Sequence, residues 1–135
     1  MTDLTALLTI KRDAALLRWA GVLFALWLFC TGPLRWVAAP ALPLWLLGSA
    51  PNFFAGLTLT FWQAFVVPSR PAGSAAVALA VLAFVEAVQL AMPQHRADPW
   101  DLLASLVGCS LAVPALYWRR RMTQHGPVLG APWKF

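Results

Sequence analysis

The sequence is poor in charged residues, and acidic residues are the scarcest of them. Only 11% of the 135 residues are Asp, Glu, Lys or Arg, and just five are acidic. Soluble domains carry about 25% charged residues, so this chain lacks the polar surface of a soluble protein. Its 61% hydrophobic content predicts a membrane protein instead.

The sequence also lacks the motifs of soluble enzymes. It has no glycine-rich phosphate loop, no Ser-His-Asp set and no HExxH pattern. Cys30 and Cys109 stand far apart in apolar segments without neighbouring His or Cys, so neither a metal-ligand spacing nor a disulfide framework is visible. We predict no catalytic residues, no metal site and no cofactor. Whether the protein is an enzyme stays open, with a non-enzymatic role favoured.

The basic residues favour a membrane partner over nucleic acid. The net charge is +5, but Lys and Arg lie mostly at the ends of apolar segments, as the positive-inside rule describes. A cytoplasmic N-terminus places eight of the ten Lys and Arg residues inside and only Arg35 and Arg96 outside. The sequence therefore predicts cytoplasmic termini, contact with membrane lipids and no contact with nucleic acid.

The chain has room for four helices that cross a hydrocarbon core about 30 Å thick. Because strand-like alternation is absent, helices are the way to satisfy the backbone in lipid. We predict an all-α integral membrane protein with one domain over residues 1–118 and a basic, loosely ordered cytoplasmic tail over 119–135. Pro51 is predicted to open the second helix, with Ser49 as its cap. The predicted transmembrane helices are 14–30, 51–67, 74–92 and 99–118.

The segments outside these helices have compositions of their own. Residues 31–50 contain several prolines and tryptophans and are expected to form an interfacial or partly re-entrant segment. Residues 68–73 are rich in proline and glycine and predict a turn. The N-terminal residues 1–19 are amphipathic and are expected to lie along the membrane surface before the chain enters the bilayer.

Three of the five acidic residues lie in the stretch from Phe84 to Gly108. A carboxylate within or just under a bilayer is costly unless a cation, a hydrogen-bond partner or a water-filled cavity accompanies it. The stretch is therefore a candidate site. Its acidic residues are Glu86, Asp98 and Asp101.

Helical spacing arranges the polar residues of this stretch on two faces. Glu86 and Gln89 follow the i, i+3 spacing and share one face of the third predicted helix. Asp101, Ser105 and Gly108 follow the i, i+4, i+7 spacing on the fourth. A tight hairpin makes the two helices antiparallel neighbours, so we predict that these faces meet near the extracytoplasmic surface.

Arg96 is the arginine nearest in sequence to these carboxylates. Its planar guanidinium can neutralise a carboxylate or bind two phosphate oxygens at once. The hypothetical binding residues are Glu86, Gln89, Arg96 and Asp101, and the secondary ones are Asp98, Ser105 and His95.

Structural roles compete with binding. Asp98 and Asp101 fit the N-cap and N3 positions of a helix that has Pro99 at N1. Glu86 and Gln89 can hydrogen-bond between helices and set their packing. A lone loop histidine such as His95 is usually solvated.

The polar residues of the stretch also form a recurring type of motif. Two hydrophobic helices carry Glu86-x-x-Gln89, then Arg96-x-Asp98-x-x-Asp101, then Gly108. This run resembles the pattern of the VanZ-like family, in detail over the last third of the chain and in the four-helix layout throughout. Ser105 stands where the family usually has Asn, and residues 49–53 lack the Asp-Lys and His often found there.

The resemblance implies a multi-pass protein of the bacterial inner membrane, associated with the cell envelope and, through the family's namesake, with glycopeptide resistance. It implies no settled reaction. Our leading hypothesis is binding of an anionic group, such as a lipid or cell-wall-precursor phosphate, by Arg96 held between Glu86 and Asp101. Two alternatives stay open: a structural or accessory subunit of a larger membrane assembly, and a proton-linked transport component that uses Glu86.

Overall fold

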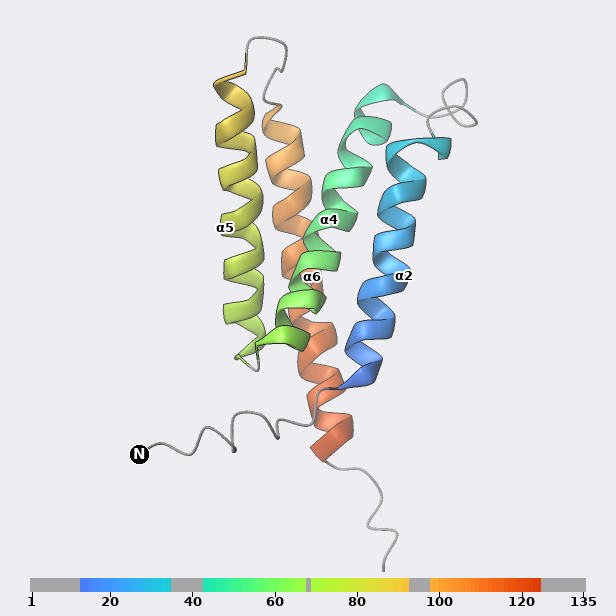
Figure 1. Cartoon of the computed structure of the whole chain (residues 1–135), viewed down its shortest axis with the longest axis vertical. Helices are drawn as coiled ribbons and strands as arrows, with labels where there is room; N and C mark the ends of the chain where they lie inside the picture. The colour runs from blue at the N-terminus through green and yellow to red at the C-terminus, as the bar shows by residue number, and fades with distance from the viewer. Residues whose placement is uncertain (1–12, 35–42, 68, 93–97, 125–135) are drawn as a thin grey trace, which may run out of the picture.

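The computed structural model describes residues 13–34, 43–67, 69–92 and 98–124, and within these ranges the protein is helical with no strand. The helices lie side by side as a bundle (Figure 1), with α2 and α5 running in one direction and α4 and α6 in the other. The prediction of an all-α protein is confirmed. The four long helices are α2 (Ala14–Thr31), α4 (Leu44–Val66), α5 (Pro71–Leu90) and α6 (Pro99–Gln124).

Three of the described helices, α2, α5 and α6, are long and apolar enough to cross a membrane. They support a multi-pass membrane protein, and α4 is not among the described helices that are apolar enough, so a fourth spanning helix stays a prediction. This helix has 23 residues, and polar residues along it, among them Asn52, Thr60 and Gln63, lower its hydropathy. Because α4 packs against all three other helices, much of its surface is covered by protein.

The start of α4 also differs from the prediction. The helix begins at Leu44, and Pro51 lies inside it and is buried. A proline inside a helix removes one hydrogen bond to the carbonyl four residues before it, and neighbouring helices allow such a loss within a membrane protein. Residues 44–50 therefore belong to α4, while residues 35–42 lie outside the described residues.

The ends of α5 and α6 are shifted as well. α5 begins at Pro71, three residues before the predicted start, because proline suits the first turn of a helix. α6 begins at the predicted Pro99 but continues to Gln124, since arginine is a good helix former. Arg119–Arg121 are thus part of α6. Residues 1–12 of the predicted N-terminal stretch and residues 125–135 of the predicted tail lie outside the described residues.

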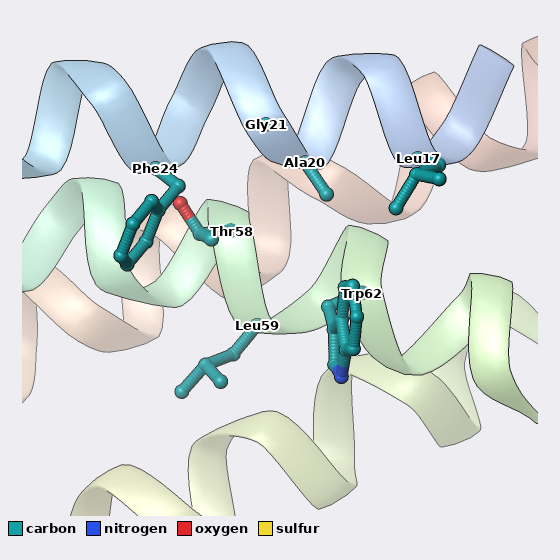
Figure 2. A pocket seen from close by; sticks show the side chains of 7 residues that line it. All are labelled: Leu17, Ala20, Gly21, Phe24, Thr58, Leu59 and Trp62. Carbon is teal, nitrogen blue, oxygen red and sulfur yellow. The ribbon is translucent and has the colours of Figure 1, made fainter.

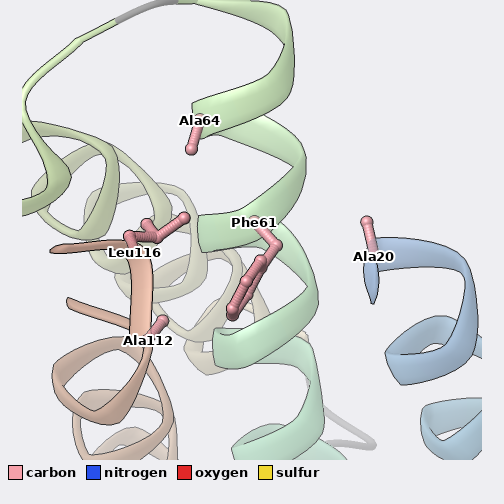
Figure 3. Packing of buried hydrophobic residues seen from close by; sticks show 5 residues of the cluster. All are labelled: Ala20, Phe61, Ala64, Ala112 and Leu116. Atoms are coloured by element: carbon pink, nitrogen blue, oxygen red, sulfur yellow. The ribbon is translucent and has the colours of Figure 1, made fainter. Parts of the chain in front are cut away.

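A cluster of buried apolar residues joins α2, α4 and α6. Figure 3 shows Leu116 and Ala112 of α6 facing the part of α4 that carries Phe61 and Ala64, with Ala20 of α2 on the other side of α4. The alanines allow neighbouring helices to approach closely. A second buried cluster, Ala75, Ala78 and Cys109, joins α5 to α6.

α4 and α6 meet backbone to backbone at two glycines. A Cβ atom at Gly108 would lie 2.2 Å from the carbonyl oxygen of Phe53, and one at Gly56 would lie 2.6 Å from that of Ser105. No side chain fits at such distances, so glycine is required at both positions. The thiol of Cys109 donates to the carbonyl of Gly56 at 3.6 Å.

Two arginines in the last turns of α6 bind residues at the end of the bundle where α2 and α5 begin. Arg119 donates from Nε to Oδ2 of Asp13 at 3.1 Å and from Nη2 to Oδ1 at 3.2 Å. Arg120 donates from Nη2 to the carbonyl of Ser69, in the turn between α4 and α5. The last turns of α6 therefore hold the start of α2 and the start of α5 together.

Candidate functional site

The structure places most of the predicted site residues at one end of the α5–α6 hairpin. Glu86 and Gln89 lie near the end of α5, and Asp98 and Asp101 lie at the start of α6. Figure 1 shows the end of α5 beside the start of α6. Arg96 and His95, which were predicted to join them, lie outside the described residues.

Two acidic residues act on the carboxyl group of Glu86. Glu86 is half-buried, and Asp101 and Asp98 lie within electrostatic range of it, Asp101 with the larger effect. Both of these neighbours are acidic, and like charges near one another favour a nearby cation or a proton. No three His, Cys, Asp or Glu side chains among the described residues are grouped so as to hold a metal ion.

Asp98 also has a role at the start of α6. Its Oδ1 accepts a hydrogen bond from the backbone N–H of Trp100 at 3.0 Å, and its carbonyl accepts one from the N–H of Asp101 at 3.0 Å. Asp101 lies in the first helical turn, where a negative charge is favoured by the helix dipole. Both acids thus stabilise the helix start as well as lying near Glu86.

The remaining residues of the predicted α6 face turn towards α4 instead of α5. Ser105 is buried and donates to the carbonyl of Asp101 at 3.0 Å and to that of Asn52 in α4 at 3.4 Å. Gly108 lies against the α4 backbone. The prediction that Asp101, Ser105 and Gly108 all face α5 is therefore wrong for Ser105 and Gly108, which contact α4. Small residues allow close contact between backbones, and on α6 they serve the contact with α4.

Two apolar grooves flank the first turns of α6. The α4–α6 groove has a volume of about 430 Å³ and is lined by residues such as Leu46, Phe53, Trp100 and Leu103. The α5–α6 groove has a volume of about 380 Å³ and is lined by residues such as Ala83, Pro99 and Leu103. Both volumes are in the range of small-molecule sites, roughly 300–1,000 Å³. Leu103 belongs to both grooves.

A third groove, between α2 and α4, contains an unusual hydroxyl group. Figure 2 shows the Thr58 oxygen directed towards α2 beside Phe24. This oxygen is buried and has no hydrogen-bond partner among the described residues. By contrast, the Thr60 hydroxyl donates to the carbonyl of Gly56 at 2.8 Å, as threonines in helices often do.

Sequence reasoning missed the role of Asp13. Its Oδ1 accepts from the N–H of Ala15 at 2.9 Å and so caps α2. The hydrogen bond from Arg119, followed by that from Ala15, lowers the pKa of Asp13 below its ordinary value. An Asp directly before an apolar helix is a recognisable start signal, but no sequence signal identifies a partner 106 residues away.

No family model, no curated protein and no solved structure matches the chain. The likeness to the VanZ-like family therefore depends on the run from Glu86 to Gly108 itself.

Proposed function

We propose that this is a VanZ-like protein of the bacterial inner membrane that binds an anionic group of a membrane lipid or lipid-linked precursor. The binding group is Arg96, held by Glu86 and Asp101 at the extracytoplasmic end of the α5–α6 hairpin. The observation that carries the proposal is the placement of three acidic residues, Glu86, Asp98 and Asp101, where α5 ends and α6 begins. Carboxylates beside apolar helices favour a nearby cation.

Arg96 is well placed in the sequence to supply that cation. It precedes Asp98 by two residues, and two residues of chain span at most roughly 7 Å. An arginine paired with carboxylates keeps further N–H donors, because its guanidinium carries five. These donors suit phosphate oxygens, which arginine binds in bidentate fashion.

The grooves beside the hairpin suit the rest of an amphiphilic ligand. Trp100 lines the α4–α6 groove and directly precedes Asp101, so an apolar chain in the groove would pass close to the acidic residues. The lining of this groove is almost wholly apolar, which favours the binding of a hydrocarbon chain. A ligand with an anionic head and an apolar chain would use both features.

The proposed orientation follows from charge. The start of α2, the start of α5 and the end of α6 lie at one end of the bundle (Figure 1) and carry Arg18, Arg70 and Arg119–Arg121. Positive charge of this kind marks the cytoplasmic side. We infer that all four helices cross the membrane, α4 as the one covered by the others, with both termini in the cytoplasm. Reporter fusions after Met92 and after Gln124 should report the extracytoplasmic and the cytoplasmic side, respectively; any other result would overturn this topology.

Retention of a labelled lipid-linked phosphate by the purified protein tests the proposed binding. Arg96→Ala should lose roughly tenfold or more in affinity, the effect of a lost charge-assisted pair. Arg96→Lys should retain part of the binding, because lysine keeps the charge but not the planar fork.

Arg70→Ala is the matched control, since Arg70 is exposed and lies at the other end of the bundle. It should bind like the wild type. Equal retention by wild type and Arg96→Ala would remove Arg96 from the role and overturn the proposal.

A further inference from the structure

The paired grooves beside α6 indicate how many hydrocarbon chains the ligand has. We propose that the ligand is a two-chain anionic phospholipid, with one acyl chain in the α4–α6 groove and the other in the α5–α6 groove. This inference rests on the proposed function, because it takes the headgroup to lie at the Arg96 end of the hairpin.

The two grooves begin at the same level of the bundle. Pro99 lines the α5–α6 groove and Trp100, the next residue, lines the α4–α6 groove. Figure 1 shows the first turns of α6 between the end of α5 and the beginning of α4. Chains that leave one headgroup at this point can therefore pass on either side of α6.

Leu103 forms a wall common to both grooves. It lies one helical turn below Pro99 and Trp100 and is 45% exposed, so it separates two adjacent channels instead of closing one. The volumes, about 430 and 380 Å³, are similar. Two chains of similar size on either side of one leucine match this arrangement better than a single long chain does.

The grooves are open to the side of the bundle that faces lipid. Val107 of the α4–α6 groove and Leu102 and Leu106 of the α5–α6 groove are exposed. In a bilayer, exposed apolar residues on spanning helices face acyl chains. A phospholipid can thus enter laterally, without the helices separating.

Groove-filling variants test the inference with defined lipids. Ala104 lines the α4–α6 groove and Ala83 lines the α5–α6 groove, so Ala104→Leu and Ala83→Leu each fill one groove. The probes are dioleoylphosphatidylglycerol, its one-chain lyso form and a polyprenyl phosphate, titrated against the full chain in detergent micelles. The wild type should bind the two-chain lipid about tenfold or more tightly than the lyso form, because each buried methylene adds affinity.

Each filling variant should lower the affinity for the two-chain lipid to that for the lyso form. It should leave the lyso form bound, because one groove stays open, and this retained binding also shows that the variant is folded. Ala80→Leu on α5 and Ala115→Leu on α6 are matched controls, since both alanines are exposed and line neither groove. They should bind like the wild type.

The outcomes separate this inference from the proposed function. If Arg96→Ala weakens binding but neither filling variant does, the headgroup site stands and the two-chain inference fails. If the filling variants weaken binding and Arg96→Ala does not, the proposed headgroup site fails, and the inference that rests on it fails too. Tighter binding of the polyprenyl phosphate than of the two-chain lipid overturns the inference in favour of a single-chain ligand. Dimers of the wild type that the groove-filling variants abolish would also overturn it, because a second copy of the chain would then occupy the grooves.

Discussion

Arg119 binds both carboxylate oxygens of Asp13, a residue 106 positions earlier in the chain, at 3.1 and 3.2 Å. The same carboxylate caps α2 through the N–H of Ala15. Asp13 thus links a local helix start to a distant helix end, and the pair joins the N-terminal and C-terminal helices of the bundle.

Asp13→Asn should lower the unfolding temperature slightly, and Asp13→Ala should lower it more. Asparagine keeps an N-cap oxygen but loses the ion pair, whereas alanine loses both. The ion pair contributes modestly, because the side chains of Arg119 and Asp13 are 38% and 29% exposed and are screened by solvent. Thermal unfolding in one detergent compares the three proteins. Equal unfolding temperatures for Asp13→Ala and wild type would contradict the linking role.

The ion pair also makes stability depend on pH in a predictable direction. The hydrogen bond from Arg119 lowers the pKa of Asp13 below its ordinary 3.8, so the unfolded chain binds this proton more readily. The contribution of Asp13 to the free energy of unfolding should be complete above its unfolded pKa of 3.8. It should disappear as the pH falls through the lower pKa that Asp13 has in the folded protein. The difference in stability between wild type and Asp13→Asn should therefore shrink between about pH 5 and pH 2. A difference in stability between the two proteins that grows on acidification would contradict the lowered pKa of Asp13.

Gly108→Ala should be strongly destabilising. Its Cβ would lie 2.2 Å from the carbonyl oxygen of Phe53, so α4 and α6 must move apart, at a cost of about 3 kcal/mol or more. Gly21→Ala is the matched control, because nothing lies within 4 Å of a Cβ there. That variant should gain up to about 1 kcal/mol from the higher helix propensity of alanine. Denaturation of both variants measures the contrast, and similar effects would argue against the backbone contact.

Thr58→Val should stabilise the protein. The substitution removes a buried hydroxyl without a partner while keeping the shape of the side chain, and such groups cost about 1–3 kcal/mol. Thr60→Val should instead destabilise it by about 1 kcal/mol, because the Thr60 hydroxyl donates to Gly56. Opposite signs in the free energy of unfolding are the expected result. A loss of stability in Thr58→Val would show that its hydroxyl has a partner.

Arg120→Ala should loosen the turn between α4 and α5. Arg120 donates to the carbonyl of Ser69 there, and a hydrogen bond from a charged group is worth about 1–3 kcal/mol. Limited proteolysis should therefore cut the variant faster near Ser69. Arg121→Ala is the control, since Arg121 is exposed and should leave the cleavage rate unchanged. Equal rates for the two variants would contradict the contact.

The helices and the α5–α6 hairpin could be predicted from sequence because apolar length and the proline-rich connections are local signals. The start of α4 could not, because Pro51 fits a first turn as well as a tolerated interior position. Neighbouring helices decide between these two readings, and they are not visible in the local sequence.

The candidate site shows the same limit. Helical spacing places Asp101 and Ser105 on one face of α6, but it does not identify the neighbour opposite each residue. Asp101 lies near Glu86 of α5, whereas Ser105 bonds to Asn52 of α4. α6 contacts both helices, so a single face is divided between them.

The polar content of α4 has a consequence for how the protein is made. Among the described helices, α4 falls outside the set apolar enough to span a membrane, yet it is synthesised before α5 and α6, two of the three helices that cover it. Polar side chains weaken the partition of an isolated helix into lipid. If α4 crosses the membrane as proposed, we expect α5 and α6 to cover its polar side chains after it enters, so that membrane integration of this chain is cooperative.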